Sequence, residues 1–464
     1  MSKKSKAQEL QAQLTWKFPH IAKEAHGQSE KAEKFCRGYK EFLDEGKTER
    51  ECVSAALKLL KAAGYQEFDP QAAYQPGDKV YYVNRGKSII ASTFGKKPLS
   101  EGLRINGAHI DSPRLDLKPN PMYEKEDLAY FKTHYYGGLR KYQWGTLPLA
   151  LHGVVVKKDQ TVMNITIGED EGDPVFCITD LLPHLAAKQN ERPLKDGIKG
   201  EELNIVIGSL PYADPDVKEP VKLLALSLLY DKYGITEKDF YRAEIEMVPA
   251  QKAKDVGLDR SLIGAYGQDD RVCAYTALMA EIGAKKPART TLTILADKEE
   301  IGSTGNTGLD SDFVLHFIQD LCQLEGLRAR DVLRASLCLS SDVNAAYDPT
   351  FSSVFEPANS CYLNKGCVLT KYTGARGKSG SNDASAEIMA KVISILEDEG
   401  VYWQAGELGA VDAGGGGTIA KFVAGMDVDT VDLGVPVLSM HSPFEITAKL
   451  DVYNTYLAFK AFYK

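Results

Sequence analysis

Five short stretches of the sequence place a histidine or a carboxylate at the end of a predicted strand. They are Gly107-Ala108-His109-Ile110-Asp111, Gln268-Asp269-Asp270, Asp297-Lys298-Glu299-Glu300, Ser341-Asp342 and Met440-His441-Ser442. A bridging carboxylate can hold two divalent ions because each of its oxygens binds one ion, while histidines and further carboxylates fill the outer positions. The five stretches therefore predict a two-metal hydrolase, and a metallopeptidase in particular.

The residues within two of these stretches fit separate tasks. His109 and Asp111 are two positions apart in an extended segment and share a face, so Asp111 could steer the imidazole or support the metal. Glu299 and Glu300 are adjacent, so their side chains diverge. One of them could bind a metal while the other faces the attacking water as a general base.

Each stretch also has a simpler interpretation when it is taken alone. Asp269 or Asp270 could merely cap the N-terminus of the helix that follows, a role that aspartate fills well. The Glu299-Glu300 pair could be a solvated acidic loop, and a single histidine such as His441 is more often a core or surface residue than a ligand. The occurrence of all five stretches at predicted strand ends favours the metal site.

The elements that must position these residues follow an α/β pattern. Amphipathic helices are predicted over residues 29–63, a hairpin over 80–92 with its turn at 84–87, and a strand over 103–110. After residue 255, strands at 291–296, 334–339 and 431–439 alternate with helices at 271–282, 311–321, 384–396 and 418–424. This alternation favours a mostly parallel sheet sandwiched by helices, in which ligands collect at the carboxyl ends of the strands.

The stretch from residue 121 to residue 250 has a different pattern of predicted secondary structure. Short β-like runs at 153–156, 162–167 and 203–207 alternate with loops, and none of the five stretches lies there. We expect an inserted, mainly β domain over 121–250, with 1–120 and 251–464 as the two parts of a catalytic domain. A chain of 464 residues is too long for one ordinary domain.

Composition excludes several classes of protein. The formal net charge of −8 argues against nucleic acid or an anionic membrane as the main partner, because both favour a basic surface. The basic start Met1-Ser2-Lys3-Lys4-Ser5-Lys6 leads into no apolar run, which predicts a cytoplasmic protein. The eight cysteines are scattered without a C-x-x-C pair, so we expect reduced, mostly buried thiols.

Four motifs make a family resemblance specific. Gly-Ala-His-Ile-Asp-Ser-Pro-Arg (107–114), Asp-Lys-Glu-Glu-Ile-Gly-Ser (297–303), Ser-Ser-Asp (340–342) and Leu-Gly-Val-Pro-Val-Leu-Ser-Met-His-Ser (433–442) resemble, in order, those of the aminopeptidase I/aspartyl aminopeptidase family. The resemblance implies a zinc-exopeptidase-like fold and a cytosolic enzyme that removes N-terminal residues from peptides. Its cofactors would be two divalent ions, with Zn²⁺ expected and Mn²⁺ or Co²⁺ as alternatives. The insertion would be a dimerisation domain, and the homo-oligomer a tetrahedral dodecamer built from dimers.

The resemblance also implies roles for single residues. Asp269 would bridge the two ions, with His109 and Asp342 on one ion and Glu300 and His441 on the other. Glu299 would be the general base and Asp111 the partner of His109.

Substrate binding is implied for two loops. Gly415 and Gly416 belong to a glycine run before a helix, where close approach of a peptide backbone is possible, although a flexible connection is an equal alternative. Lys371 lies in a basic segment with Arg376 and Lys378 and could pair with an acidic N-terminal residue of the substrate. A solvated basic loop is the alternative interpretation.

The chain departs from the family pattern in three places. The bridging motif is Gln-Asp-Asp (268–270) where many relatives have Leu-Asp-Asn, and residues 343–349 lack the histidines that many relatives carry. The stretch 136–144 lacks the histidine that aspartyl-specific members insert into the site of a neighbouring subunit. We therefore expect a broad aminopeptidase, with its preference between acidic and neutral residues left open.

Two other functional hypotheses are compatible with the same residues. A metal-dependent deacylase or carboxypeptidase on a related fold would act on N-blocked peptides, whereas an aminopeptidase requires a free amine. A non-catalytic assembly protein with structural metal would have no need of Glu299, which is useful mainly for chemistry. Measuring the metal content together with the activity on aminoacyl and N-blocked substrates distinguishes the three hypotheses.

Overall fold

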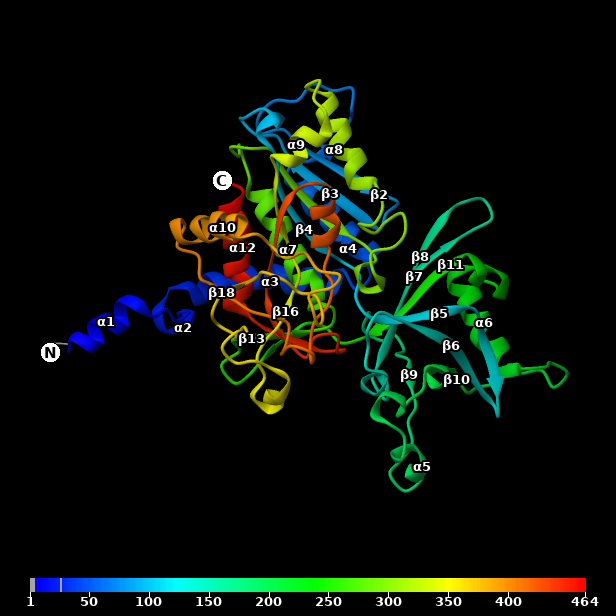
Figure 1. Cartoon of the computed structure of the whole chain (residues 1–464). Coiled ribbons are helices and arrows are strands. Elements are labelled where there is room, and N and C mark those ends of the chain that lie inside the picture. Colours follow the sequence, from blue (N-terminus) through cyan, green and yellow to red (C-terminus); the bar gives the residue numbers. More distant parts are fainter. Residues whose placement is uncertain (1–4, 26) are drawn as a thin grey trace.

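The catalytic part of the protein is built on a nine-stranded sheet in the computed structural model, which describes residues 5–25 and 27–464 (Figure 1). The strand order is β1 (Gln66–Glu67), β2 (Lys79–Asn84), β3 (Ser88–Thr93), β14 (Thr291–Ala296), β4 (Arg104–His109), β15 (Leu337–Ser340), β19 (Asp429–Gly434), β17 (Cys367–Thr370) and β18 (Trp403–Ala405). The four central strands β14, β4, β15 and β19 run parallel. The predicted helix-covered α/β sheet is therefore confirmed, with antiparallel pairs at β2–β3, β3–β14 and β17–β19.

Helices cover both faces of this sheet because its central strands are apolar on both sides. In β14, Leu295 belongs to one buried cluster and its neighbour Ile294 to another, as expected for side chains that alternate between the two faces. The first cluster includes residues of α3 (Gln28–Glu45), α4 (Glu49–Ala62) and α7 (Gln268–Gly283), and the second includes residues of α8 (Phe313–Gln323), α9 (Ala329–Arg334) and α11 (Ala420–Gly425). A further cluster joins α10 (Ala386–Asp398) and α12 (Lys449–Phe462) to α7.

A second, wholly antiparallel sheet forms a separate body beside the catalytic part (Figure 1). Its order is β8 (Val162–Ile167), β7 (Leu149–Val156), β11 (Ala243–Pro249), β5 (Arg114–Lys125), β6 (Leu128–Tyr136), β10 (Asn204–Gly208) and β9 (Cys177–Ile178). Helix α6 (Pro220–Tyr233) packs on it, and α5 (Ala187–Asn190) lies in the loop between β9 and β10. We call this body the inserted sheet.

The inserted sheet begins earlier than the expected domain limit at residue 121. Strand β5 starts at Arg114, and its pairing with β6 shifts register between Leu117 and Met122. Two prolines and a lysine at 118–121 suggest a loop, but β5 pairs with β6 both before and after these residues, which keeps the segment extended. The boundary after residue 120 therefore falls within a strand.

A small third sheet completes the catalytic part and corrects two predicted strands. Its order is β12 (Lys254–Val256), β13 (Leu262–Ala265), β21 (Glu445–Ala448), β20 (Pro436–Leu438) and β16 (Asn344–Ala345). The strand expected over 431–439 is divided between β19 and β20, which belong to different sheets, because the chain turns at Val435. The strand expected over 334–339 begins only at Leu337, since Arg334 still belongs to α9.

The remaining elements agree with the other expectations. The hairpin of β2 and β3 turns at residues 85–87, within the predicted turn at 84–87, and all eight cysteines are free thiols, buried except for the partly exposed Cys177. At the N-terminus, α1 (Lys6–Leu14) projects away from the body and is followed by α2 (Ile21–Glu24) (Figure 1). Among the described residues, no helix combines the length and the hydrophobicity that crossing a membrane requires.

Candidate metal centre

The register of the central strands brings the candidate ligands to one edge of the sheet. His109 is the last residue of β4 and pairs with Ala296, the last residue of β14. Glu299 and Glu300 follow β14 in a single 3-10 turn, and Asp342 follows the end of β15. Parallel strands end together at their carboxyl edge, so residues far apart in sequence meet there. Asp269, at the start of α7, and His441, between β20 and β21, complete the group.

Asp269 lies between the two histidines. Its Oδ1 is 3.1 Å from His109 Nε2, and its Oδ2 is 3.1 Å from His441 Nε2. Each carboxylate oxygen therefore faces a different imidazole. This is the arrangement that a carboxylate with one ion on each oxygen requires.

The other acidic residues divide between the two imidazoles. His109 Nε2 is 3.8 Å from Asp342 Oδ1 and 3.9 Å from Glu299 Oε2, whereas His441 Nε2 is 3.5 Å from Glu300 Oε1. Three groups of side chains bring their ligand atoms within 4.8 Å of one another: Asp269 with Glu300 and His441, His109 with Asp270 and Asp342, and His109 with Glu299 and Glu300. Imidazole nitrogens and carboxylate oxygens are a donor set that zinc accepts.

Several carboxylate oxygens of the site have no hydrogen-bond partner in the protein, and this shows whether the site suits a cation. Glu300 Oε1 and both carboxylate oxygens of Asp270 are buried without a hydrogen-bond partner among the described residues. Buried carboxylates without donors are unfavourable unless a cation or a proton compensates them. The residues therefore fit bound cations. Asp270, which belongs to the predicted Asp269-Asp270 stretch but was not assigned as a ligand, joins the candidate ligand groups.

Asp111 organises the first half of the site. Its Oδ1 accepts the backbone N–H of Glu299 and its Oδ2 the backbone N–H of Glu300, each at 3.1 Å. His109 Nδ1 lies 3.0 Å from the backbone carbonyl oxygen of Asp111 and 3.3 Å from its Oδ1, which leaves Nε2 facing Asp269. The carboxylate is fully buried, so these contacts fix both the ring and the turn.

Glu445 has the same function in the second half of the site, and the sequence reasoning missed it. Its Oε1 accepts the backbone N–H of His441 at 2.7 Å and its Oε2 that of Asp269 at 3.0 Å. Glu445 is buried in β21. A lone glutamate in an apolar strand is the sequence feature that could have identified it as a residue of the site. His441 itself has a left-handed backbone with φ of 62°, a strained conformation that tends to occur at functional sites.

The electrostatics of the site reflect many buried acids in one place. Burial raises the pKa of Glu299 to about 8, and the negative charges of Asp342 and Asp111 add to this rise. Burial also raises the pKa of Glu300, and the negative charge of Asp269 adds most to this rise. In Asp269, hydrogen bonds from the two histidines outweigh burial and hold the pKa well below its usual range. Bound cations would relieve this concentration of acidic groups.

The site opens into a cavity of about 440 Å³. Its lining includes five of the seven acidic and histidine candidates that were named from sequence: Asp269, Glu299, Glu300, Asp342 and His441. Gly415 and Gly416 also line it, as do Lys421 and Gly138, which the sequence reasoning did not assign.

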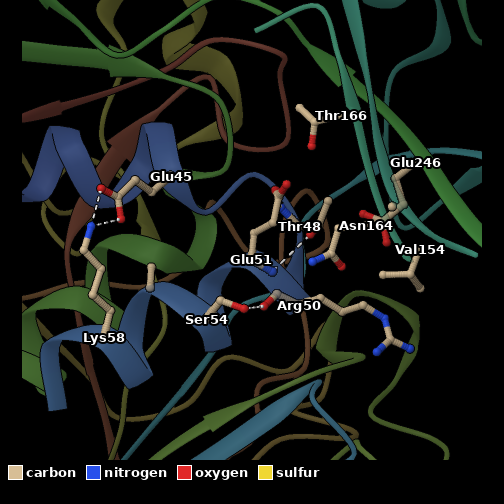
Figure 2. A pocket seen from close by; sticks show the side chains of 12 residues that line it. Glu45, Thr48, Arg50, Glu51, Ser54, Lys58, Val154, Asn164, Thr166 and Glu246 are labelled. Atoms are coloured by element: carbon tan, nitrogen blue, oxygen red, sulfur yellow. Dashed lines mark hydrogen bonds and ion pairs between the residues drawn. The ribbon is translucent and has the colours of Figure 1, made fainter. Parts of the chain in front are cut away.

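The basic segment 371–378 borders the cavity through Thr373, but its lysines point to another partner. Lys371 is absent from the cavity lining, and its Nζ pairs with Asp383 at 2.5 Å, as does Lys378 Nζ at 3.1 Å. A separate cavity of about 380 Å³ between α4 and the inserted sheet contains none of the candidate ligands; Figure 2 shows Glu51, Arg50 and Asn164 among its lining.

Comparison with known proteins agrees with this geometry. The pattern of the family described as aminopeptidase I zinc metalloprotease (M18) matches residues 42–463. A probable M18 family aminopeptidase 1 from Clostridium acetobutylicum is 51% identical over 432 residues, covering 91% of this chain and 93% of that protein. The crystal structure of an M18 family aminopeptidase from Thermotoga maritima has 44% identity and a TM-score of 0.93, and covers 97% of this chain and 100% of that chain.

A more distant structure has the same fold. The structure of mApe1 from S. cerevisiae has 21% identity and a TM-score of 0.75, and covers 94% of this chain and 96% of that chain. The family pattern and the bacterial relatives span nearly the whole sequence. The chain therefore belongs to the aminopeptidase I (M18) family and is a zinc metalloaminopeptidase.

Proposed function

We propose that this aminopeptidase uses two metal ions, with Asp269 as the bridging ligand. His109 and Asp342 would complete one ion, and Glu300 and His441 the other. The observation that supports this assignment best is that the two oxygens of Asp269 each lie 3.1 Å from a different imidazole. When bound, zinc would supply Lewis acidity for the scissile carbonyl and would lower the pKa of a water molecule.

Glu299 is the general base in this proposal. Both glutamates line the cavity, but the side chain of Glu299 is 17% exposed, whereas that of Glu300 is 3% exposed and faces His441. A carboxylate that stays accessible can take a proton from the attacking water and deliver it to the leaving amine. Asp111 holds the backbone of both glutamates, which keeps these two roles on different side chains.

The cavity next to the proposed metal ligands is the proposed substrate-binding site. Gly415 has a φ of 124°, and a Cβ at this position would collide with the backbone of Ala375. The segment 415–417 therefore presents bare backbone to the cavity, where an extended peptide can approach closely. Peptides with a free N-terminus are the proposed substrates.

A matched pair of variants tests the mechanism. Glu299→Gln is expected to lower kcat by about 10²- to 10⁴-fold while both ions stay bound, because a general base contributes to proton transfer and not to ligation. Glu300→Gln is expected to lose metal as well as activity. Metal analysis of both purified variants, with kcat on an aminoacyl substrate, is the measurement. Loss of metal from Glu299→Gln with retention in Glu300→Gln would reverse the two roles.

The alternative activities are separated by their substrates. A deacylase or a carboxypeptidase on a related fold would hydrolyse N-acylated peptides, and a non-catalytic assembly protein would hydrolyse neither class. We expect release of N-terminal residues from free-amine peptides and no reaction with their N-acetylated counterparts. Hydrolysis of the blocked series alone would overturn the proposed function.

We also propose a cytoplasmic homo-oligomer larger than a dimer. The relative from S. cerevisiae is described as a dodecamer, and the inserted sheet contributes none of the proposed ligands. Eight free thiols without a disulfide suit a reducing compartment. A tetrahedral dodecamer of dimers is the specific expectation. Light scattering on the purified protein measures its mass, and an active monomer of 50.9 kDa would contradict the proposal.

A further inference from the structure

The end of strand β6 reaches from the inserted sheet into the metal centre. Tyr136 is the last residue of β6, and Gly137 and Gly138 follow it directly. All three contact groups that the proposed mechanism depends on. We call residues 136–138 the β6 tip.

Tyr136 contacts the carboxylate that organises the first half of the site. Its hydroxyl donates to Asp111 Oδ2 at 2.8 Å, the same oxygen that accepts the backbone N–H of Glu300. Burial and the charge of Asp111 raise the pKa of Tyr136, so its hydroxyl keeps the proton that it donates. Asp111 in turn contacts His109 Nδ1 through its backbone carbonyl at 3.0 Å and its Oδ1 at 3.3 Å, and its Oδ1 also accepts the backbone N–H of Glu299.

The two glycines contact the second half of the site. The Gly138 carbonyl oxygen lies 2.9 Å from His441 Nδ1 and accepts a hydrogen bond from it, which leaves Nε2 for Asp269 and Glu300. Gly137 has a φ of 75°, and a Cβ there would lie 3.2 Å from Glu300 Oε2. The chain therefore passes so close to the ligand side chains that a larger residue would be crowded.

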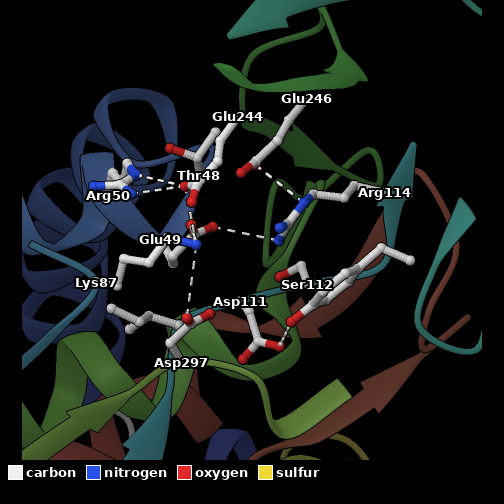
Figure 3. Close-up of polar contacts among 12 residues, drawn as sticks. Thr48, Glu49, Arg50, Lys87, Asp111, Ser112, Arg114, Glu244, Glu246 and Asp297 are labelled. Atoms are coloured by element: carbon white, nitrogen blue, oxygen red, sulfur yellow. Dashed lines mark hydrogen bonds and ion pairs between the residues drawn. The ribbon is translucent and has the colours of Figure 1, made fainter. Parts of the chain in front are cut away.

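Arg114 fixes the tyrosine from behind. Its guanidinium lies 3.9 Å from the centre of the Tyr136 ring, and its Nε and Nη1 are 3.2 Å from Glu246 and 3.3 Å from Glu49. Figure 3 shows Arg114 between Glu246 of the inserted sheet and Glu49 of α4, with Asp111 nearby. Arg114 is itself buried, so the ring rests on a cation whose position is set by carboxylates of both parts of the chain.

We propose that Tyr136 is a positioning residue, through which the inserted sheet orients Asp111 and thereby the zinc ligand His109 and the general base Glu299. This inference rests on the proposed two-metal mechanism and deepens it. In this account the inserted sheet takes part in catalysis within its own chain, in addition to any role in assembly. The same β6 tip sets the tautomer of His441 through the Gly138 carbonyl.

The test compares Tyr136→Phe with Tyr135→Phe in the full-length protein. The phenylalanine at 136 keeps the ring over Arg114 and removes only the hydroxyl. Tyr135 precedes it on β6, is 41% exposed and touches none of the proposed ligands, so it is the matched control. For each variant, kcat and KM are measured on a free-amine peptide, zinc affinity by competition with a chelator, and thermal midpoint and mass as checks of folding.

We expect Tyr136→Phe to lose about 10- to 100-fold in kcat or zinc affinity, as other supporting groups of metal ligands do, with KM, mass and thermal midpoint unchanged. Tyr135→Phe should match the natural protein. Wild-type kcat and zinc affinity in Tyr136→Phe, or a fall in thermal midpoint without a change in either, would overturn the inference. If Glu299→Gln is inactive while Tyr136→Phe is fully active, only this inference fails. If Glu299→Gln is fully active, the proposed mechanism fails first.

Discussion

Glu281 is a buried carboxylate whose surroundings make the stability of the protein depend on pH. It is fully buried in α7, and its Oε1 accepts hydrogen bonds from Thr93 at 2.7 Å and Thr291 at 2.9 Å, while its Oε2 accepts one from Thr293 at 3.1 Å. Tyr65 OH is 3.1 Å from Oε1. Within the described ranges no cation pairs with this carboxylate, so burial raises its pKa above the ordinary value of 4.5 despite the hydroxyl donors.

The sign and size of the effect follow from this raised pKa. Between the ordinary pKa and the raised one, the folded chain binds one more proton at Glu281 than the unfolded chain does. The stabilisation is fully present below pH 4.5 and is lost as the pH rises through the folded pKa. Within that window the free energy of unfolding falls by about 1.4 kcal/mol per pH unit. Glu281→Gln cannot ionise. The free energy of unfolding of this variant, minus that of the natural protein, should therefore increase with pH, by up to about 1.4 kcal/mol per pH unit.

The measurement is the difference in urea midpoint between Glu281→Gln and the natural protein, from about pH 5 to about pH 8, at fixed protein and zinc concentrations. Taking the difference removes the contribution of every other titrating group. Glu41→Gln, at an exposed position of α3, is the matched control for removing a glutamate charge from the chain. A flat or falling difference for Glu281→Gln would show that the hydroxyl groups stabilise the ionised carboxylate more than burial disfavours it.

Two further predictions concern the metal centre and its cavity. Asp269→Ala should deplete both ions in metal analysis, because each of its oxygens faces a different imidazole, and one ion left at full occupancy would refute the bridging role. The ammonium group of Lys371 pairs with Asp383 and would have to leave it to bind an acidic substrate residue. If it does, Lys371→Ala should lower kcat/KM roughly ten-fold on substrates with N-terminal Asp or Glu, and less on substrates with N-terminal Leu. Lys421→Ala is the comparison, because Lys421 lines the cavity, and a selective loss there alone would transfer the role to Lys421.

The strand-end residues of the site were predictable because a parallel sheet brings strand ends together. The apolar runs before His109 and Glu299 identify strands β4 and β14, and the rule that ligands collect at carboxyl ends then groups their side chains. No long-range pairing was needed for these residues, because β4, β14 and β15 all end at the same edge. The family resemblance added the division of ligands between two ions, which residue types alone left open.

The supporting residues were not predictable in the same way. Glu445 reaches the site because β21 pairs with β13 and β20 in a small sheet, and its single carboxylate looks like an ordinary strand position in the sequence. Lys371 does not line the cavity and pairs with Asp383, twelve positions later, so its contact with the substrate stays a prediction. Such contacts depend on tertiary packing, which neither periodicity nor spacing encodes.

The structure also changes what the inserted sheet is expected to do. An insertion that served only assembly would contact the catalytic part through its surface and leave the ligands to the central strands. Here the chain leaves β4 at His109, enters the inserted sheet at Arg114, and returns to the metal centre at Tyr136 before it moves away again. Because the hydroxyl of Tyr136 and the carbonyl of Gly138 each contact a different half of the site, a shift of the inserted sheet against α4 would disturb both halves together. In the proposed oligomer, assembly would therefore be coupled to catalysis through this one segment, and an interface that moves the inserted sheet is expected to change zinc affinity as well as turnover.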